Sequence, residues 1–306
     1  MSEKKLMIIA AVNGGAQLDR EGARVPVTPA EIAEEAVRCH KAGASVIHIH
    51  ARDKNKQATA DVKIFGEIIK RIRDKCEILI QTTNGIGIHR EPGTGRLVWP
   101  TDEERLGLLT IEPKQDLFSL AGGSWDFYHP EGGYAGPASF LNTDDLIRKN
   151  ILGVLQTGAA IELEIVEIGF LEKLRRLAGD GVFDPDNPRV WLQLSFGFGG
   201  MPATARMLVN AHDEAQRLFP KLKWEVLGAG KNQFRIGAMG ALMGCDFVRV
   251  GFEDNIYLPN GRPAQHNYQL VEAMVRIAGE FGREPANVAD ARAALTLGNW
   301  SDQLKN

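Results

Sequence analysis

The clearest chemical feature of the sequence is a pair of histidines, His48 and His50, inside the apolar stretch 46–53 (VIHIHARD). Side chains alternate between the two faces of a β-strand, so both imidazoles are expected to point the same way. Imidazole nitrogens are common ligands of Zn²⁺ and other borderline metal ions. The spacing therefore predicts half of a metal site. On spacing alone, two histidines hydrogen-bonded in a polar core are an equal alternative.

A second polar group, near the C-terminal end, offers a third ligand. In the stretch 248–255 (VRVGFEDN), extended backbone places Arg249, Gly251 and Glu253 on one face. Asp254 then faces the other way unless the chain turns after Glu253, which the turn-forming residues that follow permit. A His₂Glu set leaves coordination positions open for substrate, as catalytic zinc requires. A salt bridge is the simpler explanation for Glu253 taken alone.

Other polar residues follow or line predicted strands. Residues 81–85 (QTTNG) carry hydroxyl and amide groups that orient a carboxylate or carbonyl, or that cap a loop. Glu162 and Glu164 alternate with apolar residues, so both carboxylates are expected to point inward, where an unpaired charge is costly. They either support a histidine N–H or an arginine, which we favour, or belong to an internal ion network.

A glycine-rich stretch, 228–233 (GAGKNQ), follows another predicted strand. Loops late in a barrel often bind phosphate, so this one can hold a phosphate or the tail of coenzyme A. The signal is weak because GAGK is not a complete phosphate-binding loop.

A repeated structural unit must position these residues. Short apolar runs recur, each followed by a polar or glycine-rich turn and then an amphipathic segment of helical period, such as 28–43, 61–75, 143–158 and 169–181. Eight such units predict a parallel sheet closed into a (β/α)8 TIM barrel, with an open doubly wound sheet as the alternative. The runs are 6–12, 44–50, 77–83, 116–122, 160–166, 190–196, 223–229 and 246–252.

The barrel prediction has consequences for the site. Chemistry in such barrels lies at the C-terminal ends of the strands, where the polar residues above occur. The last strand of a closed barrel returns beside the first, so His48, His50 and Glu253 are expected to be near neighbours. We expect one domain over residues 1–306, with 130–140 as a long loop that serves as a lid or an oligomer contact.

Local signals mark helix ends. Thr28, Pro29 and Glu31 are typical of a helix start, with threonine as the N-cap and proline at the first helical position. Gly43 and Gly158 stand where C-terminal caps are expected.

The composition argues against several classes of protein. The chain has 306 residues, 44% hydrophobic residues and a formal net charge of −3, so neither nucleic acid nor an anionic membrane is expected as a main partner. No apolar run approaches the ~20 residues of a membrane span, and the run 6–12 is too short for most signal peptides. Three cysteines without CxxC spacing predict reduced core thiols in a cytoplasmic protein. They are Cys39, Cys76 and Cys245.

Three motifs resemble the beta-keto acid cleavage enzyme family, whose prototype cleaves 3-keto-5-aminohexanoate. They are HIHARD (48–53), QTTNG (81–85) and VRVGFEDNIY (248–257), and the likeness runs from AAVNGG (10–15) to REPANVADARAALTLG (283–298). The resemblance implies a TIM barrel, Zn²⁺ and a homotetramer. The implied reaction converts a beta-keto acid and acetyl-CoA into acetoacetate and a new acyl-CoA.

The resemblance also implies catalytic roles. His48, His50 and Glu253 match the zinc ligands, Asp254 matches the base that removes the alpha proton, and Arg249 matches its partner. Zinc would chelate the keto and carboxylate oxygens and stabilise the enolate, which attacks the thioester before a retro-Claisen cleavage. The pKa of an aspartate in water is about 3.9. Because Arg249 opposes a raised pKa, we expect the metal to acidify the substrate instead.

The implied substrate contacts include departures from the prototype. Thr83 stands in place of a serine that helps the base, Ser119 matches a threonine, and Ala121 replaces an asparagine. The glutamate that binds the substrate's amino group is missing, because no acid follows the first strand before Asp19. We therefore expect an uncharged or differently functionalised beta-keto acid. The expected substrate contacts are Asn13, Gln17, Thr83, Ile86, Ser119 and Ala121.

Two other functions fit the same residues. A metal-dependent aldolase or hydrolase would use the same His₂Glu site without a thioester. A non-catalytic ligand-binding barrel would be indicated by loss of the base, yet Asp254, Arg249 and Thr83 are all present. The fold alone does not decide between these functions.

Overall fold

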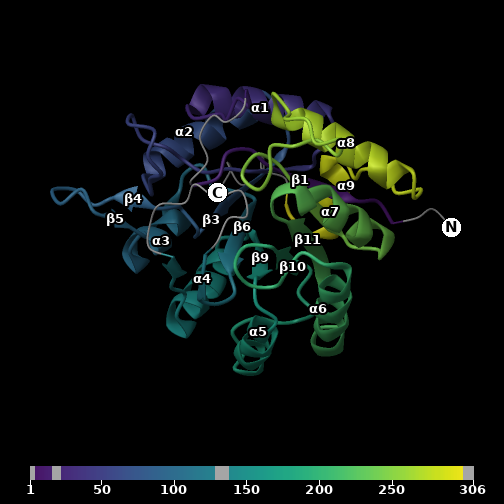
Figure 1. Cartoon of the computed structure of the whole chain (residues 1–306). Helices are drawn as coiled ribbons and strands as arrows, with labels where there is room; N and C mark the ends of the chain where they lie inside the picture. Colours follow the sequence, from purple (N-terminus) through teal and green to yellow (C-terminus); the bar gives the residue numbers. More distant parts are fainter. Residues whose placement is uncertain (1–3, 16–21, 128–137, 299–306) are drawn as a thin grey trace.

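The computed structural model describes residues 4–15, 22–127 and 138–298, in which eight parallel strands close into a barrel (Figure 1). Each predicted apolar run contains one of these strands, so the predicted TIM barrel is confirmed. The barrel strands are β1 (Met7–Ala11), β2 (Val46–His48), β3 (Leu79–Thr83), β6 (Leu117–Ala121), β9 (Ala160–Ile165), β10 (Val190–Phe196), β11 (Lys223–Gly228) and β12 (Phe247–Val250).

The last barrel strand lies beside the first. The strand order around the barrel is β1-β12-β11-β10-β9-β6-β3-β2, and β1 pairs with both β12 and β2. The alternative of an open doubly wound sheet is therefore wrong, because an open sheet leaves two edge strands. Ile9 of β1 has Arg249 on one side and Val46 on the other. This closure brings the ends of β2 and β12 together across a single strand.

Helices surround the strands in Figure 1. At the start of α1, the Thr28 hydroxyl accepts a hydrogen bond from the Glu31 amide, and the Glu31 carboxylate accepts one from the Thr28 amide. These two bonds confirm the predicted cap. Gly43 follows this helix at φ +110°, a conformation that favours glycine. The helices are α1 (Pro29–Lys41), α2 (Val62–Arg73), α3 (Asp102–Gly107), α4 (Asp144–Gln156), α5 (Gly169–Gly179), α6 (Ala205–Leu218), α7 (Gln233–Leu242), α8 (Asn267–Gly279) and α9 (Val288–Ala294).

The barrel interior changes from apolar to polar along its axis. Side chains near the strand starts are apolar: Trp191 stacks on Phe247 with 5.0 Å between ring centroids, and residues of α9 pack against this layer. Two residues further along the same strands, the buried side chains are polar. They are His48, Gln81, Ser119, Glu162, Gln193, Glu225 and Arg249. Burying polar groups costs free energy unless they are hydrogen-bonded, so this second layer must form a connected network.

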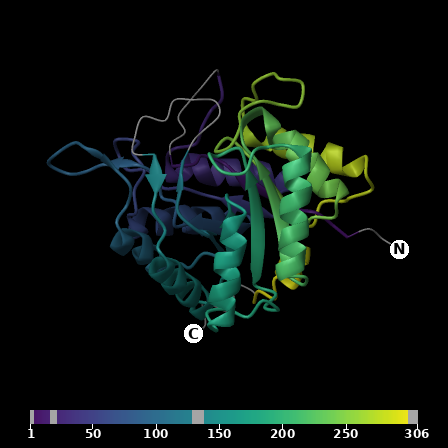
Figure 2. The same cartoon turned by 60° about the horizontal axis from the view of Figure 1, so that its bottom comes forward.

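Two short hairpins lie outside the barrel. β4 (His89–Arg90) pairs with β5 (Leu97–Val98), and β7 (Trp125–Asp126) pairs with β8 (Ser139–Phe140). Figure 2 shows the β4–β5 hairpin projecting outward at the end of the barrel that also carries the loop between β12 and α8. The predicted loop 130–140 lies outside the described residues except for its last three positions.

The cysteines and helices bear on two further sequence predictions. All three cysteines are free; Cys39 and Cys245 are buried, whereas Cys76 is half-buried. The prediction of core thiols is thus confirmed for two of the three. Among the described residues, no helix has both the length and the apolar character needed to cross a membrane.

Candidate active site

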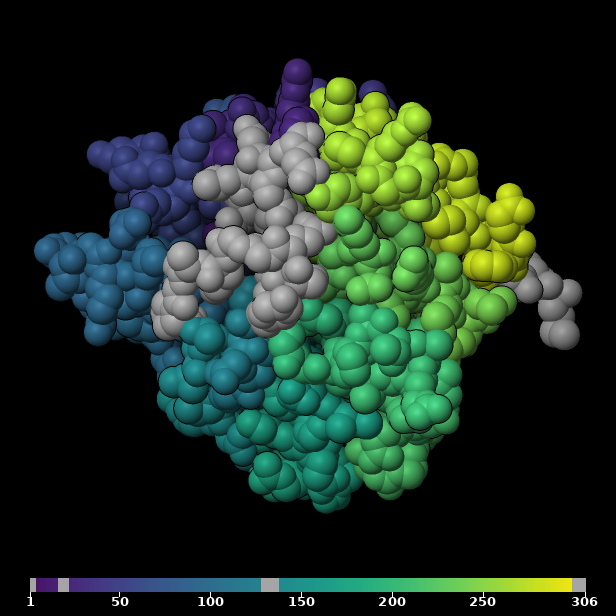
Figure 3. Space-filling model, viewed as in Figure 1, coloured from purple at the N-terminus to yellow at the C-terminus, as the bar shows by residue number. Residues whose placement is uncertain are grey.

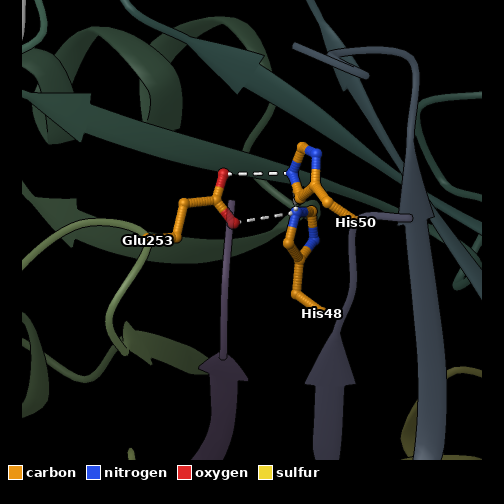
Figure 4. Close-up of side chains that lie close together, drawn as sticks. All are labelled: His48, His50 and Glu253. Carbon is orange, nitrogen blue, oxygen red and sulfur yellow. Dashed lines mark hydrogen bonds and ion pairs between the residues drawn. The ribbon is translucent and has the colours of Figure 1, made fainter. Parts of the chain in front are cut away.

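Two histidines and one glutamate converge at the C-terminal end of the barrel (Figure 4). The Nε2 atoms of His48 and His50 are 3.2 Å apart, and each lies 3.3 Å from a different carboxylate oxygen of Glu253. The imidazoles are almost completely buried, whereas the Glu253 side chain keeps 20% of its exposure. The arrangement therefore faces partly outward, as a site open to a small molecule must.

The hydrogen bonds of the two imidazoles fit a bound cation. His48 Nδ1 lies 2.8 Å from Gln81 Oε1, and His50 Nδ1 lies 3.2 Å from the carbonyl oxygen of Ile86. Both partners are acceptors, so each ring carries its proton on Nδ1. The two Nε2 lone pairs and the Glu253 carboxylate then converge without a proton between them. Three such donor atoms, all within 4.8 Å of one another, repel each other unless a metal ion lies between them.

Burial keeps His48 neutral, the form that binds metals. Burial, reinforced by Arg249 and His50, lowers the pKa of His48 to about 3 even though Glu253 opposes this shift. Burial alone would raise the pKa of Glu253, but Arg249 and the two histidines outweigh it and hold that pKa well below the usual range. Neutral imidazoles beside a carboxylate are the protonation states that zinc binding requires.

A turn after β12, rather than a continued strand, places the glutamate. The strand ends at Val250, and the amides of Asp254 and Asn255 both donate to the carbonyl of Gly251. The expectation that Arg249 and Glu253 share one face of an extended strand is therefore wrong. The tight turn brings both carboxylates back toward Arg249, and the Glu253 amide donates to the carbonyl of Ala11.

Close approach of the chains makes glycine necessary in this turn. Gly251 has φ +147°, and a Cβ there would lie 2.1 Å from the carbonyl oxygen of Ala11. Gly14, at φ +61°, faces the turn from the other side, where a Cβ would lie 2.6 Å from Glu253 Cγ. The two glycines therefore let the loops after β1 and β12 pack against each other around the glutamate.

Gly251→Ala is expected to destabilise the protein and to displace Glu253. Strained backbone costs about 1–3 kcal/mol, and the clash with Ala11 adds to it. Gly244→Ala is the matched control, because Gly244 also has positive φ (+85°) but has open space around it. Urea unfolding should give a lower midpoint and zinc analysis a lower metal content for the Gly251 variant. Equal midpoints for the two variants would show that the close approach does not matter.

Arg249 joins the two carboxylates of the turn. Its guanidinium donates to both oxygens of Asp254, at 2.8 and 2.9 Å, and lies 2.9 Å from Glu253 Oε1. The Asp254 side chain is completely buried. Burial raises the pKa of Asp254 to about 6 despite the opposing charge of Arg249. Arg249 thus opposes the raised pKa as expected, but desolvation outweighs the ion pair, and the expected acidification of the substrate by a metal stays a prediction.

The polar network below the site differs from the predicted one in its first contact. Gln81, not a glutamate, bonds His48, and Gln81 Nε2 in turn donates to Glu162 at 2.9 Å. Ser119 donates to the other oxygen of Glu162 at 2.7 Å. Glu164 is half-buried and accepts from Ser195 at 3.3 Å, and burial raises its pKa to about 7. Glu162 therefore supports His48 through Gln81.

The residues expected to contact substrate occupy varied positions. Thr83 Oγ1 accepts from the Gly85 amide and makes no hydrogen bond with Asp254 within the described part of the chain. Ile86 is buried, and its carbonyl holds His50. Ser119 faces Glu162, and Ala121 is buried beside it on β6. The expected contacts of these residues with substrate stay predictions.

Asn13 has a structural role that the sequence did not indicate. Its side-chain amide donates to the carbonyl of His50 at 2.9 Å, and its oxygen accepts from the His50 amide at 3.0 Å. Asn13 thereby fixes the backbone of a candidate metal ligand that lies beyond the end of β2. Gln17, the other predicted neutral contact, lies outside the described residues.

Two buried arginines near the site had no clear signal in the sequence. Arg52 donates to the carbonyl of Gly14 at 2.7 Å, which holds the loop after β1. Arg105 donates to the carbonyls of Asn84 and Leu141, at 3.2 and 2.7 Å, and so ties the loop after β3 to the residues after β8. Arg52 lies within the HIHARD motif, but only the two histidines of that motif have a spacing that indicates a function.

The glycine-rich loop after β11 reaches the same end of the barrel. It forms the short helix η2 (Gly230–Asn232), and the Gly230 amide donates to the backbone carbonyl of Asp254 at 2.8 Å. The exposed Lys231 places its ammonium 4.9 Å from the ring centroid of Tyr257. Figure 3 looks onto this end, where residues of the β12–α8 loop form part of the rim. The ammonium group of Lys231 therefore lies beside the candidate site, on its solvent-exposed side.

Known proteins match nearly the whole chain in sequence. The 3-keto-5-aminohexanoate cleavage enzyme of Fusobacterium nucleatum subsp. nucleatum is 34% identical over 296 residues, which cover 96% of this chain and 98% of that protein. The 3,5-dioxohexanoate:acetyl-CoA acetone transferase of Paraburkholderia graminis is 27% identical, with 97% of each chain covered.

The fold is also found among solved structures. Apo ObcA superimposes with a TM-score of 0.71 at 18% identity, over 90% of this chain and 66% of that one. This likeness shows the fold alone.

The profile of the beta-keto acid cleavage enzyme family matches residues 5–297, which include every candidate site residue. With residues 5–297 matched by the family profile and a relative that is 34% identical over 98% of its length, the chain belongs to the beta-keto acid cleavage enzyme family.

Proposed function

We propose that the protein is a zinc-dependent enzyme that transfers the acyl part of a beta-keto acid to coenzyme A. The carbon–carbon bond between the alpha carbon and the keto carbon breaks, and the alpha carbon forms a new bond to the acetyl carbon of acetyl-CoA. The thiolate moves from the acetyl carbon to the released acyl group. The products are acetoacetate and a new acyl-CoA. The observation that carries this proposal is the His48, His50 and Glu253 cluster with the Arg249–Asp254 pair beside it.

We assign separate roles to the residues of the site. When bound by His48, His50 and Glu253, zinc supplies Lewis-acid polarisation of substrate oxygens. Asp254 takes the alpha proton, and the bidentate bond from Arg249 holds its carboxylate in one orientation. The electron pair left at the alpha carbon attacks the acetyl thioester and expels the thiolate. After the original carbon–carbon bond has broken, Asp254 returns the proton to the alpha carbon. The side chain of Asp254 is completely buried, which raises its pKa and makes it a better base than an aspartate in water.

We further propose that the substrate carries no ammonium group at its fifth carbon. Ala121 stands where the prototype has an asparagine, and no acid follows β1 before Asp19. The substrate named for the Fusobacterium relative does carry an amino group. A panel of beta-keto acids tests this, and the highest kcat/KM for the 5-amino compound would contradict it. In that case Glu164→Gln would show whether the half-buried carboxylate on β9 recognises the cation.

We propose that the ammonium group of Lys231 binds the phosphates of coenzyme A. Lys231→Ala is expected to raise KM for acetyl-CoA about fivefold, the effect of losing an exposed ion pair of about 1 kcal/mol. Acetyl-pantetheine lacks the nucleotide phosphates, so the variant should match the wild type with that substrate. Lys221→Ala is the control, because Lys221 precedes β11 at the opposite end of the barrel and pairs with Asp186. An equal loss with both thioesters would contradict this assignment.

An isotope experiment tests the reaction itself. The purified enzyme is incubated with a beta-keto acid and with acetyl-CoA labelled by ¹³C at both acetyl carbons. Mass spectrometry should find both labelled carbons in acetoacetate and none in the new acyl-CoA, and metal analysis should find one zinc per chain. Labelled carbon in the new acyl-CoA would rule out the proposed bond changes.

Other outcomes would favour the rival functions. Cleavage of the acid without acetyl-CoA would indicate an aldolase or hydrolase. Zinc binding with no turnover of any acid would favour a ligand-binding barrel. A protein without metal would remove the basis of the His48, His50 and Glu253 site.

A further inference from the structure

A chain of buried hydrogen bonds runs from the candidate metal site toward the centre of the barrel. His48 and Gln81 are partners in register on the neighbouring strands β2 and β3. His48 Nδ1 meets Gln81 Oε1 at 2.8 Å, and Gln81 Nε2 meets Glu162 Oε2 at 2.9 Å. The Gln81 and Glu162 side chains are completely buried. No solvent therefore competes for these contacts.

The carboxylate of Glu162 determines which way the Gln81 amide points. An amide side chain has one accepting end and one donating end, whereas an ionised carboxylate only accepts. Glu162 must therefore face the NH₂ end of Gln81, which leaves the oxygen for His48. Ser119 donates to the second oxygen of Glu162, so the carboxylate cannot turn away. If the amide flipped, its NH₂ group would face His48 Nδ1, and His48 would have to carry its proton on Nε2 instead.

A second buried carboxyl group, that of Glu225, lies near Glu162. Glu225 is completely buried, and its oxygens accept from Trp191 Nε1 at 2.8 Å and from Gln193 Nε2 at 2.7 Å. Burial and the neighbouring Glu162 raise the pKa of Glu225 well above the usual range. The proximity of Glu162 thus disfavours a second negative charge on Glu225.

We propose that Glu162 is a positioning residue for metal binding: through Gln81 it makes His48 carry its proton on Nδ1 and present Nε2 to the metal. This inference rests on the metal site of the proposed function. It assigns a role in zinc affinity to a side chain whose hydrogen bonds, within the described residues, go to Gln81 and Ser119 and not to His48, His50 or Glu253. Partners of this kind typically change metal affinity by about 10–100-fold.

Zinc affinity of the purified chain, measured by competition with a chromophoric chelator, tests the proposal. Gln81→Met and Glu162→Met are each expected to weaken zinc binding by about 10–100-fold. Gln193→Met is the matched control, because Gln193 is an equally buried glutamine in the same polar layer that bonds Glu225 and not a ligand. Its zinc affinity should stay within about twofold of the wild type. A normal affinity in Glu162→Met, or an equal loss in the control, would overturn the proposal.

A second measurement does not depend on any variant folding. Long-range ¹H–¹⁵N NMR of the wild-type protein reports which ring nitrogen of His48 carries the proton. The proposal requires the Nδ1–H form both with and without zinc, and an Nε2–H form in the zinc-free protein would overturn it. Neither readout uses turnover. If only the proposed acyl-transfer function is wrong, the protein will still bind zinc and show the Nδ1–H form of His48, but it will produce no acetoacetate.

Discussion

Asp254→Asn is expected to lower kcat by about 10²–10⁴-fold, the usual contribution of a general base, while zinc content stays at one per chain. Asparagine keeps the shape of the side chain and can still accept from Arg249, but it cannot take up the alpha proton. Asp254 is not among the three converging ligands, so its replacement leaves the metal cluster intact. Steady-state assays of acetoacetate, together with zinc analysis of the same samples, measure both quantities.

Deuterium exchange separates the proton transfer from later steps. In D₂O the wild-type enzyme should exchange the alpha protons of the beta-keto acid faster than the uncatalysed rate, even without acetyl-CoA. Asp254→Asn should lose this enhancement. Asp246→Asn is the control, because Asp246 is also buried but pairs with Lys4 and with the Trp224 amide, away from the cluster. Near-normal turnover by the Asp254 variant would show that another group is the base.

His50→Ala is expected to remove the metal and, with it, at least about a thousandfold of activity. A bound metal is worth several kcal/mol of charge stabilisation, and each 1.4 kcal/mol changes a rate about tenfold. His50 supplies one of two imidazole nitrogens in a three-residue cluster, and its loss leaves only one nitrogen beside Glu253. Metal analysis and kcat/KM of the same preparation should fall together.

Two comparisons make this prediction specific. His89→Ala changes a histidine of the β4–β5 hairpin outside the cluster, and it should keep both zinc and activity. Wild-type enzyme stripped of metal by a chelator should lose activity and regain it when zinc is added, whereas the His50 variant should not respond. Retention of one zinc per chain by His50→Ala would place the metal elsewhere.

Much of the architecture followed from local patterns. The eight apolar runs each contain a barrel strand, and Thr28 caps α1 as expected. These features are predictable because strand alternation and helix capping depend on residues within a few positions of one another. The same reasoning predicted that His48 and His50 point together, and their Nε2 atoms are 3.2 Å apart.

The contacts within the site were less predictable. The sequence suggested a glutamate as the support of a histidine, but Gln81 lies between His48 and Glu162, which is 81 residues further along the chain from Gln81. Likewise, Asn13 binds the backbone of His50 instead of being free to face a substrate. Which polar groups meet depends on the register of neighbouring strands and on the loops beyond them. No local pattern encodes that register.

The sequence by itself thus determined the barrel, the end of the barrel that carries the site, and the residue types able to bind a metal. Only the tertiary structure decided how Glu253 and Asp254 reach Arg249, because a turn at Gly251 replaces the expected strand. It also decided the protonation of Asp254, whose pKa rises to about 6 because burial outweighs the arginine beside it. Desolvation depends on every atom packed around a group, and that packing exists only once distant segments have come together.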